Sequence, residues 1–418
     1  MMRSLFSGVS GLRNHQTRMD VIGNNIANVN TTGFKASSVN FEDMLSQTIQ
    51  GASSPQNGLG GTNPMQVGLG VTLASISTNF TDGSTESTGV DTDLAISGNG
   101  FFVLAPNSKN TDNLVYTRAG NFDFDKQGNY VVPGTGYNVM GWMGNNGVIN
   151  SSGDVMGINI PVGLQMACNK TTTVTYEHNL DSNGALVPTP ATAPTSITVY
   201  DGQGNPHILN GTLTKTAPNT WSFTTPATDN TGATVALTAT TVTFSAGGVY
   251  TGGTATVVIT PASPIGASPF TVTLDFTKLT QYNDGEGSTV KATDQDGYAA
   301  GTLASTTMDT SGVITGKFTN GQSQKLAQVA LAVFNNPGGL LKLGDTTYAE
   351  SNNSGQKQIG PSNSGGRGAI APGSLEMSNV DLAQEFSDMI ITQRGFQANS
   401  KIITTSDDML QILADLKR

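Results

Sequence analysis

Residues 5–29 read LFSGVSGLRNHQTRMDVIGNNIANV, and this stretch decides the expected architecture because its apolar residues recur at a helical spacing. The residues that stand seven apart are Leu5, Leu12, Met19 and Ile26, with Ile22 and Val29 interleaved. A seven-residue apolar repeat is typical of one face of an amphipathic helix. The sequence therefore predicts a helix at the N-terminal end.

The other end of the chain repeats the pattern. Every seventh residue is apolar at Leu382, Met389, Phe396, Ile403 and Leu410, flanked by Phe386, Ile390, Leu413 and Leu416. A second amphipathic helix is predicted from about residue 379, with Ser378, Asn379 or Asp381 as its cap.

Neither helix is expected to be stable alone. The first contains Gly8, Gly11 and Gly23, and each glycine costs about 1 kcal/mol relative to alanine inside a helix. Glycines also let a second backbone come close, so the two helices are predicted to pair as a coiled coil. The apolar stripes are thin, and both ends are expected to become ordered on assembly.

The chain between the helices changes to short alternating runs broken by Gly, Asn and Asp, which is typical of antiparallel β-structure. The predicted fold is multidomain and mainly β with helical termini and nested antiparallel β domains. The expected parts are a helical domain of 1–30 and 376–418, linkers at 31–69 and 351–375, an outer β domain of 70–144 and 281–350, and an inserted Thr-rich β domain of 145–280.

Composition excludes several classes of protein. The 418 residues include 20 Lys and Arg against 30 Asp and Glu, a formal charge of −10, which excludes a basic nucleic-acid binder. No apolar run approaches the roughly 18 residues of a membrane span, and the N-terminus lacks the apolar core of a secretory signal. We therefore expect neither membrane insertion nor signal-peptide export.

No chemical motif is recognisable. The three histidines, His15, His178 and His207, are too scattered for a metal cluster, and the single cysteine, Cys168, has no context of a nucleophile. The Asp-rich stretch 123–128 begins like a calcium loop, but Gly134 stands where the bidentate glutamate is required, which favours a β-turn. No enzyme, cofactor or metal is predicted, although paired carboxylates of a hydrolase would not be visible in a sequence.

Several short motifs carry a family resemblance. The N-terminal ones are DVIGNNIAN at 20–28 and TGFK at 32–35, which contain Asn24, Asn25, Asn28, Gly33 and Phe34. The others are DLAISGNGFF at 93–102, YTRAGNF at 116–122, GSLE at 373–376 and FQAN at 396–399. Together and in this order they resemble the bacterial flagellar rod and hook axial proteins.

The resemblance implies a subunit that polymerises into a tube, with its terminal helices lining the central channel. The residues expected between subunits are Leu5, Leu12, Met19, Ile22, Ile26, Leu382, Phe386, Met389, Phe396, Ile403 and Leu410. The length and the Thr-rich insertion resemble the hook-type members, which implies a flexible curved tube that transmits torque as a universal joint. The linkers would then be its hinges.

Alternatives remain open at this point. The stretch 46–69 also resembles part of the distal rod protein, so a stiff rod-type subunit is the first alternative, and a surface adhesin or a hydrolase comes after it. The implied partners are other copies of the chain, a distal rod protein, a hook cap, hook–filament junction proteins and the flagellar type III export apparatus. The implied location is the flagellum, outside the cell.

Overall fold

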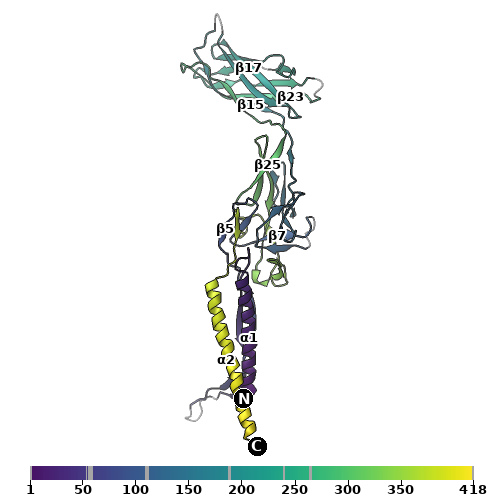
Figure 1. Ribbon diagram of the computed structural model, residues 1–418. Coiled ribbons are helices and arrows are strands. Elements are labelled where there is room, and N and C mark those ends of the chain that lie inside the picture. The colour runs from purple at the N-terminus through teal and green to yellow at the C-terminus, as the bar shows by residue number, and fades with distance from the viewer. Residues whose placement is uncertain are drawn as a thin grey trace. The chain divides into compact units, whose positions relative to one another are not determined.

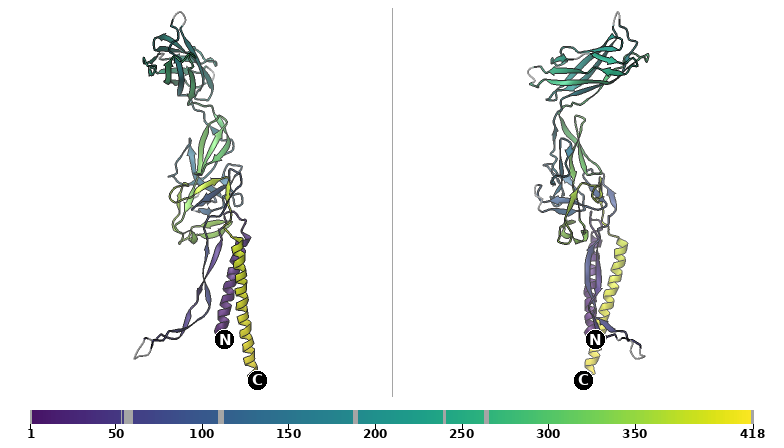
Figure 2. Two further views of the ribbon diagram at one scale, coloured as in Figure 1. Left: turned by 90° about the vertical axis from the view of Figure 1, so that its left-hand side faces the viewer. Right: turned by 180° about the vertical axis from the view of Figure 1, so that it is seen from behind.

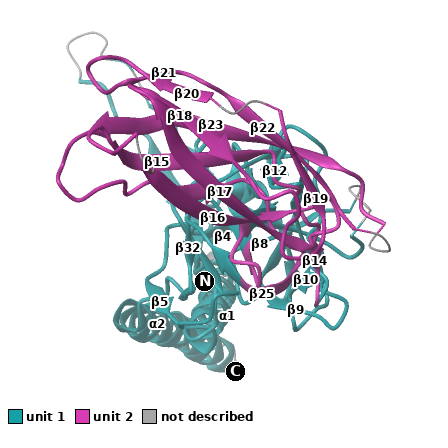
Figure 3. Cartoon of the chain, turned by 90° about the horizontal axis from the view of Figure 1, so that it is seen from above, with its two compact units in different colours: residues 1–162, 306–315, 324–418 teal, residues 163–305, 316–323 magenta. Residues whose placement is uncertain are grey.

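The computed structural model describes residues 2–52, 54, 60–108, 113–186, 190–238, 241–262 and 266–416. Figure 3 colours its two compact units: unit 1 comprises residues 1–162, 306–315 and 324–418, and unit 2 comprises residues 163–305 and 316–323. In the chain, unit 2 is therefore inserted into unit 1. The domain boundaries that composition suggested, with the insertion at 145–280, stay a prediction.

The two predicted terminal helices are confirmed. Helix α1 spans Met2–Ala27 and helix α2 spans Leu382–Asp415, and they contact each other within unit 1 (Figure 1). Helix α2 begins slightly after the predicted residue 379 because Asp381 is its N-cap, accepting hydrogen bonds from the amides of Ala383 and Gln384. Among the described residues, no helix combines the length and apolarity that a membrane crossing requires.

The β body of unit 1 is built on a central sheet. Its main strands run in the order β11 (Asn138–Asn145), β7 (Phe101–Ala105), β8 (Val115–Thr117), β30 (Thr347–Ala349) and β29 (Leu341–Gly344). Strand β28 (Leu331–Val333) also pairs with β7. Their buried side chains form one core that includes Phe101, Tyr116, Trp142, Phe334 and Tyr348.

Paired strands occupy much of the sequence that composition suggests is linker. Strand β1 (Ser37–Asp43) pairs with β4 (Val71–Thr78), and β2 (Ser46–Gln50) pairs with β3 (Met65–Gly68). In the second stretch, β31 (Gln358–Gly360), β32 (Ala369–Pro372) and β33 (Ser374–Glu376) pair with β28, β6 (Leu94–Ser97) and β5 (Thr85–Ser87). Most of these partners lie far away in the sequence, which is why local composition did not indicate them. Residues 53 and 55–59 of the first stretch lie outside the described residues.

Unit 2 is a sandwich of two five-stranded sheets around one core. The first sheet runs in the order β19 (Thr234–Leu237), β22 (Ala255–Thr260), β23 (Phe270–Tyr282), β15 (Thr173–Asp181) and β24 (Lys291–Gln295). The second runs in the order β16 (Thr192–Tyr200), β17 (Pro206–Ala217), β18 (Thr220–Thr224), β20 (Thr241–Phe244) and β21 (Tyr250–Gly252). The pair β15 and β23 is parallel, an exception to the antiparallel pattern that we predicted.

Smaller strands complete the chain. They are β9 (Asp123–Phe124), β10 (Tyr130–Val131), β12 (Val148–Ile149), β13 (Met156–Gly157), β14 (Gln165–Met166), β25 (Gly301–Met308), β26 (Val313–Phe318) and β27 (Ser323–Val329). The Asp-rich stretch at 123–128 is a turn, as predicted: the Asp125 carboxylate accepts hydrogen bonds from the amides of Gln127 and Asn129.

Two further aspartate turns in unit 2 meet at a buried histidine. The Nδ1 atom of His207 lies 2.6 Å from a carboxylate oxygen of Asp229, and its Nε2 lies 3.6 Å from a carboxylate oxygen of Asp201. Burial by itself raises the pKa of Asp229, but hydrogen bonds from His207, Thr231 and the backbone outweigh it and bring the pKa below the usual 3.8. The pKa of Asp201 is lowered in the same way, with Asn205 as the main donor against burial.

This arrangement predicts an acid-sensitive unit 2. A carboxyl group whose pKa is lowered by folding stabilises the folded state above its unfolded pKa, about 3.9, and loses that contribution as the pH falls through the folded value. We expect Asp229→Asn to lower the stability of unit 2 by about 1–3 kcal/mol at pH 7. Below pH 4 the stability of the variant should fall less steeply with pH than that of the unchanged protein. Urea unfolding followed by the fluorescence of Trp221, in a Trp142→Phe background, measures this, and an unchanged midpoint at pH 7 would contradict it.

Candidate functional site: the terminal helix pair and its buried ion cluster

Helices α1 and α2 meet along a seam of small and polar residues. An added Cβ at Gly8 would lie 3.4 Å from Ile403, one at Gly11 would lie 2.6 Å from Asn399, and one at Gly395 would lie 2.6 Å from His15. Gly8 and Gly11 therefore allow the close approach that the sequence predicted, whereas Gly23 does not take part, since nothing lies within 4 Å of a Cβ added there. Because the partner numbers fall as the α1 numbers rise, the helices are antiparallel.

Polar pairs fix the register of this seam. Arg18 donates to Asp388 at 3.1 Å, and the side-chain amide of Asn25 donates to Glu385 at 2.8 Å. Both members of the Arg18–Asp388 pair are more than a quarter exposed, so the pair contributes at most about 1 kcal/mol. Burial raises the pKa of Glu385, and the hydrogen bond from Asn25 partly opposes that rise. These polar pairs thus specify the register in which the two helices meet.

His15 lies where α1, α2 and β1 meet. Its ring is edge-on to Phe41 at 6.0 Å between centroids, and burial together with the nearby Arg18 lowers its pKa, so the imidazole is neutral at pH 7. It also lines a groove between the two helices whose apolar floor is formed by Met19 and Phe396. These two are the members of the predicted interface that the structure brings to one groove.

The other apolar residues predicted for the interface divide into two groups. On α1, Ile22 is buried and Leu5, Leu12, Met19 and Ile26 are half-buried. On α2, Met389 and Ile403 are half-buried, whereas Leu382, Phe386, Phe396 and Leu410 are 38–50% exposed. We call these exposed residues, together with Ile390, the α2 stripe. No side chain of the α2 stripe is among the nearest neighbours of a seam glycine, whereas Ile403 is, and Phe396 borders the seam through the groove that it lines with Met19.

The motif residues at the end of α1 join the helix to strand β1. Asn25 is almost fully buried, and its side-chain amide exchanges hydrogen bonds of 2.8 and 3.0 Å with the backbone of Ser37. Asn28 donates to the backbone of Asn24 and accepts from Thr31, which closes the helix end. These contacts give the asparagines of the DVIGNNIAN motif a structural role.

Gly33 and Phe34 hold the chain against the sheet. Gly33 adopts φ of +67°, its amide donates to the Glu376 carbonyl at 2.8 Å, and an added Cβ would lie 2.4 Å from the Ala119 nitrogen. Only glycine fits this position without displacing backbone. Phe34 is buried, with the Lys342 ammonium 4.4 Å from the centre of its ring.

A buried ion cluster lies immediately after these residues. Lys35 donates to Glu376 at 2.6 Å, with both side chains fully buried, and Arg118 lies 3.4 Å from Glu376 and 3.3 Å from Asp82. Lys35 also donates to the Thr81 carbonyl, and the Gly83 amide donates to Glu376. Burial lowers the pKa of Lys35, and the contacts with Glu376 oppose that fall. Lys35, Arg118 and Glu376 thus form the buried part of the cluster, and Asp82, whose side chain is 45% exposed, adds a second carboxylate at its surface.

Sequence reasoning missed this cluster, although its signal was present. Lys35, Arg118 and Glu376 are the charged residues of the TGFK, YTRAGNF and GSLE motifs. In a chain with only 12% charged residues, single charges inside otherwise uncharged motifs could have indicated buried pairs. The pairing itself could not be predicted, because Lys35 and Glu376 are 341 residues apart in the sequence.

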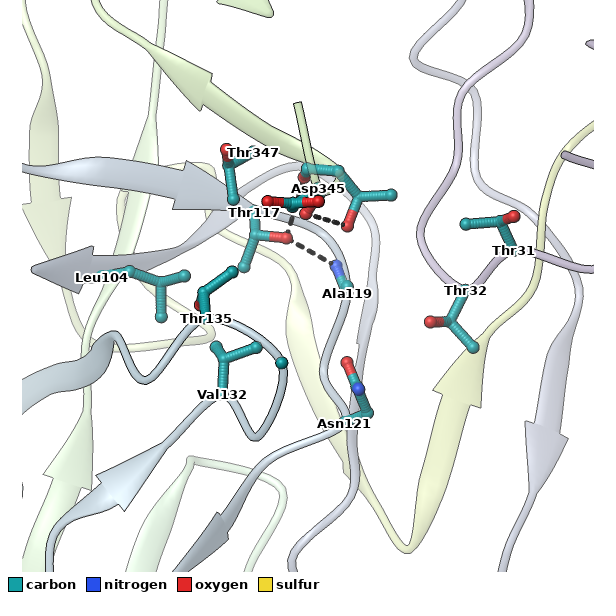
Figure 4. A pocket seen from close by; sticks show the side chains of 12 residues that line it. Thr31, Thr32, Leu104, Thr117, Ala119, Asn121, Val132, Thr135, Asp345 and Thr347 are labelled. Atoms are coloured by element: carbon teal, nitrogen blue, oxygen red, sulfur yellow. Dashed lines mark hydrogen bonds between the residues drawn. The ribbon is translucent and has the colours of Figure 1, made fainter. Parts of the chain in front are cut away.

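A small pocket of about 280 Å³ opens beside Gly33, between the loop after α1 and the edge of the central sheet. Figure 4 shows its lining, in which Thr31 and Thr32 face Thr117, Thr135 and Thr347. Within the described part of the chain, no group of three or more His, Cys, Asp or Glu side chains could hold a metal ion. Cys168 hydrogen-bonds to the Gly202 carbonyl, and nothing in this arrangement resembles a nucleophile with a base.

The chain matches four families of flagellar proteins. Residues 5–35 match the flagella basal body rod protein family, and residues 95–190 match the flagellar hook protein FlgE/F/G D1 domain. Residues 167–298 match the flagellar basal body protein FlaE D2 domain, and residues 371–416 match the C-terminal region of the flagellar basal body rod FlgEFG proteins.

Full-length relatives are similar over the whole chain. The flagellar hook protein FlgE of Borreliella burgdorferi is 44% identical and that of Treponema pallidum is 43% identical, each over 100% of both chains. The flagellar basal-body rod protein FlgG of Bacillus subtilis is 33% identical, also over 100% of both chains.

The ion cluster generates a stability prediction. Glu376→Ala leaves Lys35 and Arg118 buried without their shared carboxylate, and breaking a buried ion pair costs about 3–5 kcal/mol. We expect that loss in unit 1, measured by urea unfolding with Trp142 as the reporter in a Trp221→Phe background.

The exposed pair Lys278–Glu177 provides the control. Its lysine side chain is 61% exposed, so solvent screens the pair and Glu177→Ala should leave the stability of unit 2 almost unchanged. Equal losses for Glu376→Ala and Glu177→Ala, each measured in its own unit, would show that burial of the cluster does not contribute as described.

Proposed function

The chain belongs to the flagellar hook protein family, FlgE, and from that membership we propose how this hook subunit assembles and transmits force. The family is non-enzymatic, and the chain is a structural axial protein of the flagellum, active in motility. Axial proteins assemble with other axial subunits. The proposal concerns which surfaces make those contacts and which parts carry the load.

The observation that carries the proposal is that α2 uses different residues to contact α1 and to form its exposed apolar surface. Its seam with α1 contains glycines, polar residues and Ile403, while Phe386, Ile390 and Phe396 are 50%, 59% and 42% exposed. An apolar surface of this kind on a soluble subunit is typical of a protein contact. We propose that the α2 stripe, together with the half-buried Leu5, Leu12, Met19 and Ile26 of α1, packs against helices of neighbouring copies.

The energies favour assembly as the main source of order in the helices. Fully burying a large apolar side chain stabilises by about 1.5–3 kcal/mol before entropy is subtracted. Several such side chains lie on each α2, so each added subunit gains more from its neighbours than the exposed Arg18–Asp388 pair contributes within the chain. The groove floored by Met19 and Phe396 offers a place for part of this packing.

The buried ion cluster supports a role in force transmission. It joins Lys35, eight residues after the end of α1, to Glu376, six residues before the start of α2, and to Arg118, which follows strand β8. Asn379 adds to this connection by accepting from the Ala36 amide and donating to the Asn79 carbonyl. We propose that torque passes from the helices into the β body of unit 1 through these residues rather than through a free linker.

Several finer features of the proposal come from family membership. The partners at the ends of the hook would be a distal rod protein, a hook cap and hook–filament junction proteins, and export would use the flagellar type III apparatus. The assembled hook would be a curved tube acting as a universal joint. A stiff rod-type subunit is the remaining structural alternative, favoured less because the hook relatives are more similar than the rod relative over the same full length.

Electron microscopy of the purified protein, polymerised with a salting-out salt that strengthens apolar burial, tests this function. Curved tubes are expected. Straight tubes would favour the rod-type alternative, and a persistent failure to polymerise with or without seeds would contradict the proposed assembly surfaces.

Variants on α2 test the proposed interface. Phe396→Asp places a charge in the α2 stripe without touching a seam glycine, so the monomer should keep its helix content while tube formation is lost. Ile403→Asp should reduce both the helix content of the monomer and tube formation, because Ile403 packs beside Gly8. Circular dichroism of the monomer and sedimentation of polymer measure the two effects.

Ser387→Asp is the matched control, since it adds the same charge on α2 at an exposed residue whose hydroxyl bonds only within its own helix. It should polymerise as the unchanged protein does. If Phe396→Asp polymerised equally well, the α2 stripe would not be the assembly surface.

A further inference from the structure

The outer edge of the central sheet in unit 1 carries a second, chemically different surface. Strand β29 ends that sheet and pairs with β30 but with no other described strand. All four of its residues are exposed, Leu341 at 59% and Leu343 at 55%. Natural proteins usually protect an edge strand with charge, yet Lys342, the charged residue of β29, lies over the ring of Phe34 instead.

The turn that follows β29 holds a carboxylate at the mouth of the threonine-lined pocket. Asp345 and Thr346 both have positive φ, 48° and 54°, a conformation that costs about 1–3 kcal/mol for residues other than glycine. The turn is held by the Thr117 hydroxyl, which donates to the Thr346 carbonyl (Figure 4). The Thr347 hydroxyl also donates to the Gly344 carbonyl. The Asp345 carboxylate is exposed and forms no ion pair with any described residue.

The lining of the pocket indicates which group would fit it. Its polar lining consists of threonine hydroxyls, the side-chain amide of Asn121 and one charged group, Asp345, and its apolar lining includes Leu104 and Val132. An ammonium group has three N–H donors and no acceptor, so a lysine could pair with the carboxylate while the hydroxyls accept its remaining hydrogens. An arginine or a carboxylate would match this small, acceptor-rich pocket less well.

The same chain offers suitable lysines. In the described part of unit 1, Lys126, Lys325 and Lys357 are exposed and form no ion pair. In a homopolymer every copy presents both surfaces, so a lysine on one copy meets the Asp345 pocket of another without any other protein. The exposed Leu341 and Leu343 beside the pocket would provide the apolar part of the same contact.

We propose that strand β29 and the Asp345 pocket form an interface with a second copy of this chain, in which a lysine ammonium of that copy binds Asp345. This inference rests on the proposed function, because it requires a polymer. The subunits would then contact each other at two places, through the α2 stripe and through the β body, and the second contact would owe its specificity to an ion pair.

Carbodiimide coupling tests the inference directly, since it joins a carboxylate to an adjacent lysine as an amide with loss of water. Tubes grown from a mixture of ¹⁴N- and ¹⁵N-labelled protein should give, after proteolysis and mass spectrometry, a peptide pair that links Asp345 to a lysine and carries both labels. The unpolymerised protein and tubes of Asp345→Asn should not give it. Tubes that form normally but yield no mixed-label link at Asp345 would overturn the inference and leave the proposed function intact.

Charge reversal provides the second readout. Asp345→Lys should raise the protein concentration needed for tube formation about tenfold, because like charges then meet at the contact. Asp91→Lys makes the same change at another exposed carboxylate of unit 1 and should leave that concentration unchanged. Equal effects of the two variants would contradict the inference, and a failure of the unchanged protein to polymerise would remove both it and the proposed function. Trp142 fluorescence verifies that each variant is folded.

Discussion

The structure of unit 1 depends on one buried electrostatic constraint, the pairing of Lys35 and Arg118 with Glu376. Two fully buried side chains of opposite charge are costly to desolvate, and they are tolerated because each finds its partner and further hydrogen bonds from backbone groups. The Glu376 carbonyl also receives the amide of Gly33. Removing any of these groups would leave a charge or a polar atom unsatisfied, so the two chain ends and the β8 segment must come together in one way.

This constraint explains how a weak helix pair can have a defined position. The seam of Gly8, Gly11 and Gly395 brings the helices close, and its polar pairs set register rather than strength. The anchoring is therefore done at the end of the pair, through Asn25, the ion cluster and Asn379. The apolar residues of α2 remain free for other copies, which is the property that an assembling subunit needs.

The sequence predicted the elements better than their connections. Seven-residue spacing located both helices, and the aspartate turns were recognisable at Asp123–Gly128 because turn chemistry is local. Strands within the expected linkers were not predicted, because β1, β32 and β33 are defined by partners elsewhere in the chain. The ion cluster was missed for the same reason, since a lysine at 35 and a glutamate at 376 become a pair only in three dimensions. The predicted interface residues could be assigned to helix faces from spacing, but which of them face α1 depends on where the glycines allow contact.

The central claim is that the polar seam holds α1 and α2 of one chain together while the α2 stripe is buried between chains. The most direct test is a cryo-electron microscopy map of the assembled tube at a resolution that shows side chains. The account predicts Arg18 beside Asp388 of the same chain, and Phe386, Ile390 and Phe396 buried against helices of neighbouring subunits. A map in which these three side chains face the central channel, or in which Arg18 pairs with another subunit, would contradict it.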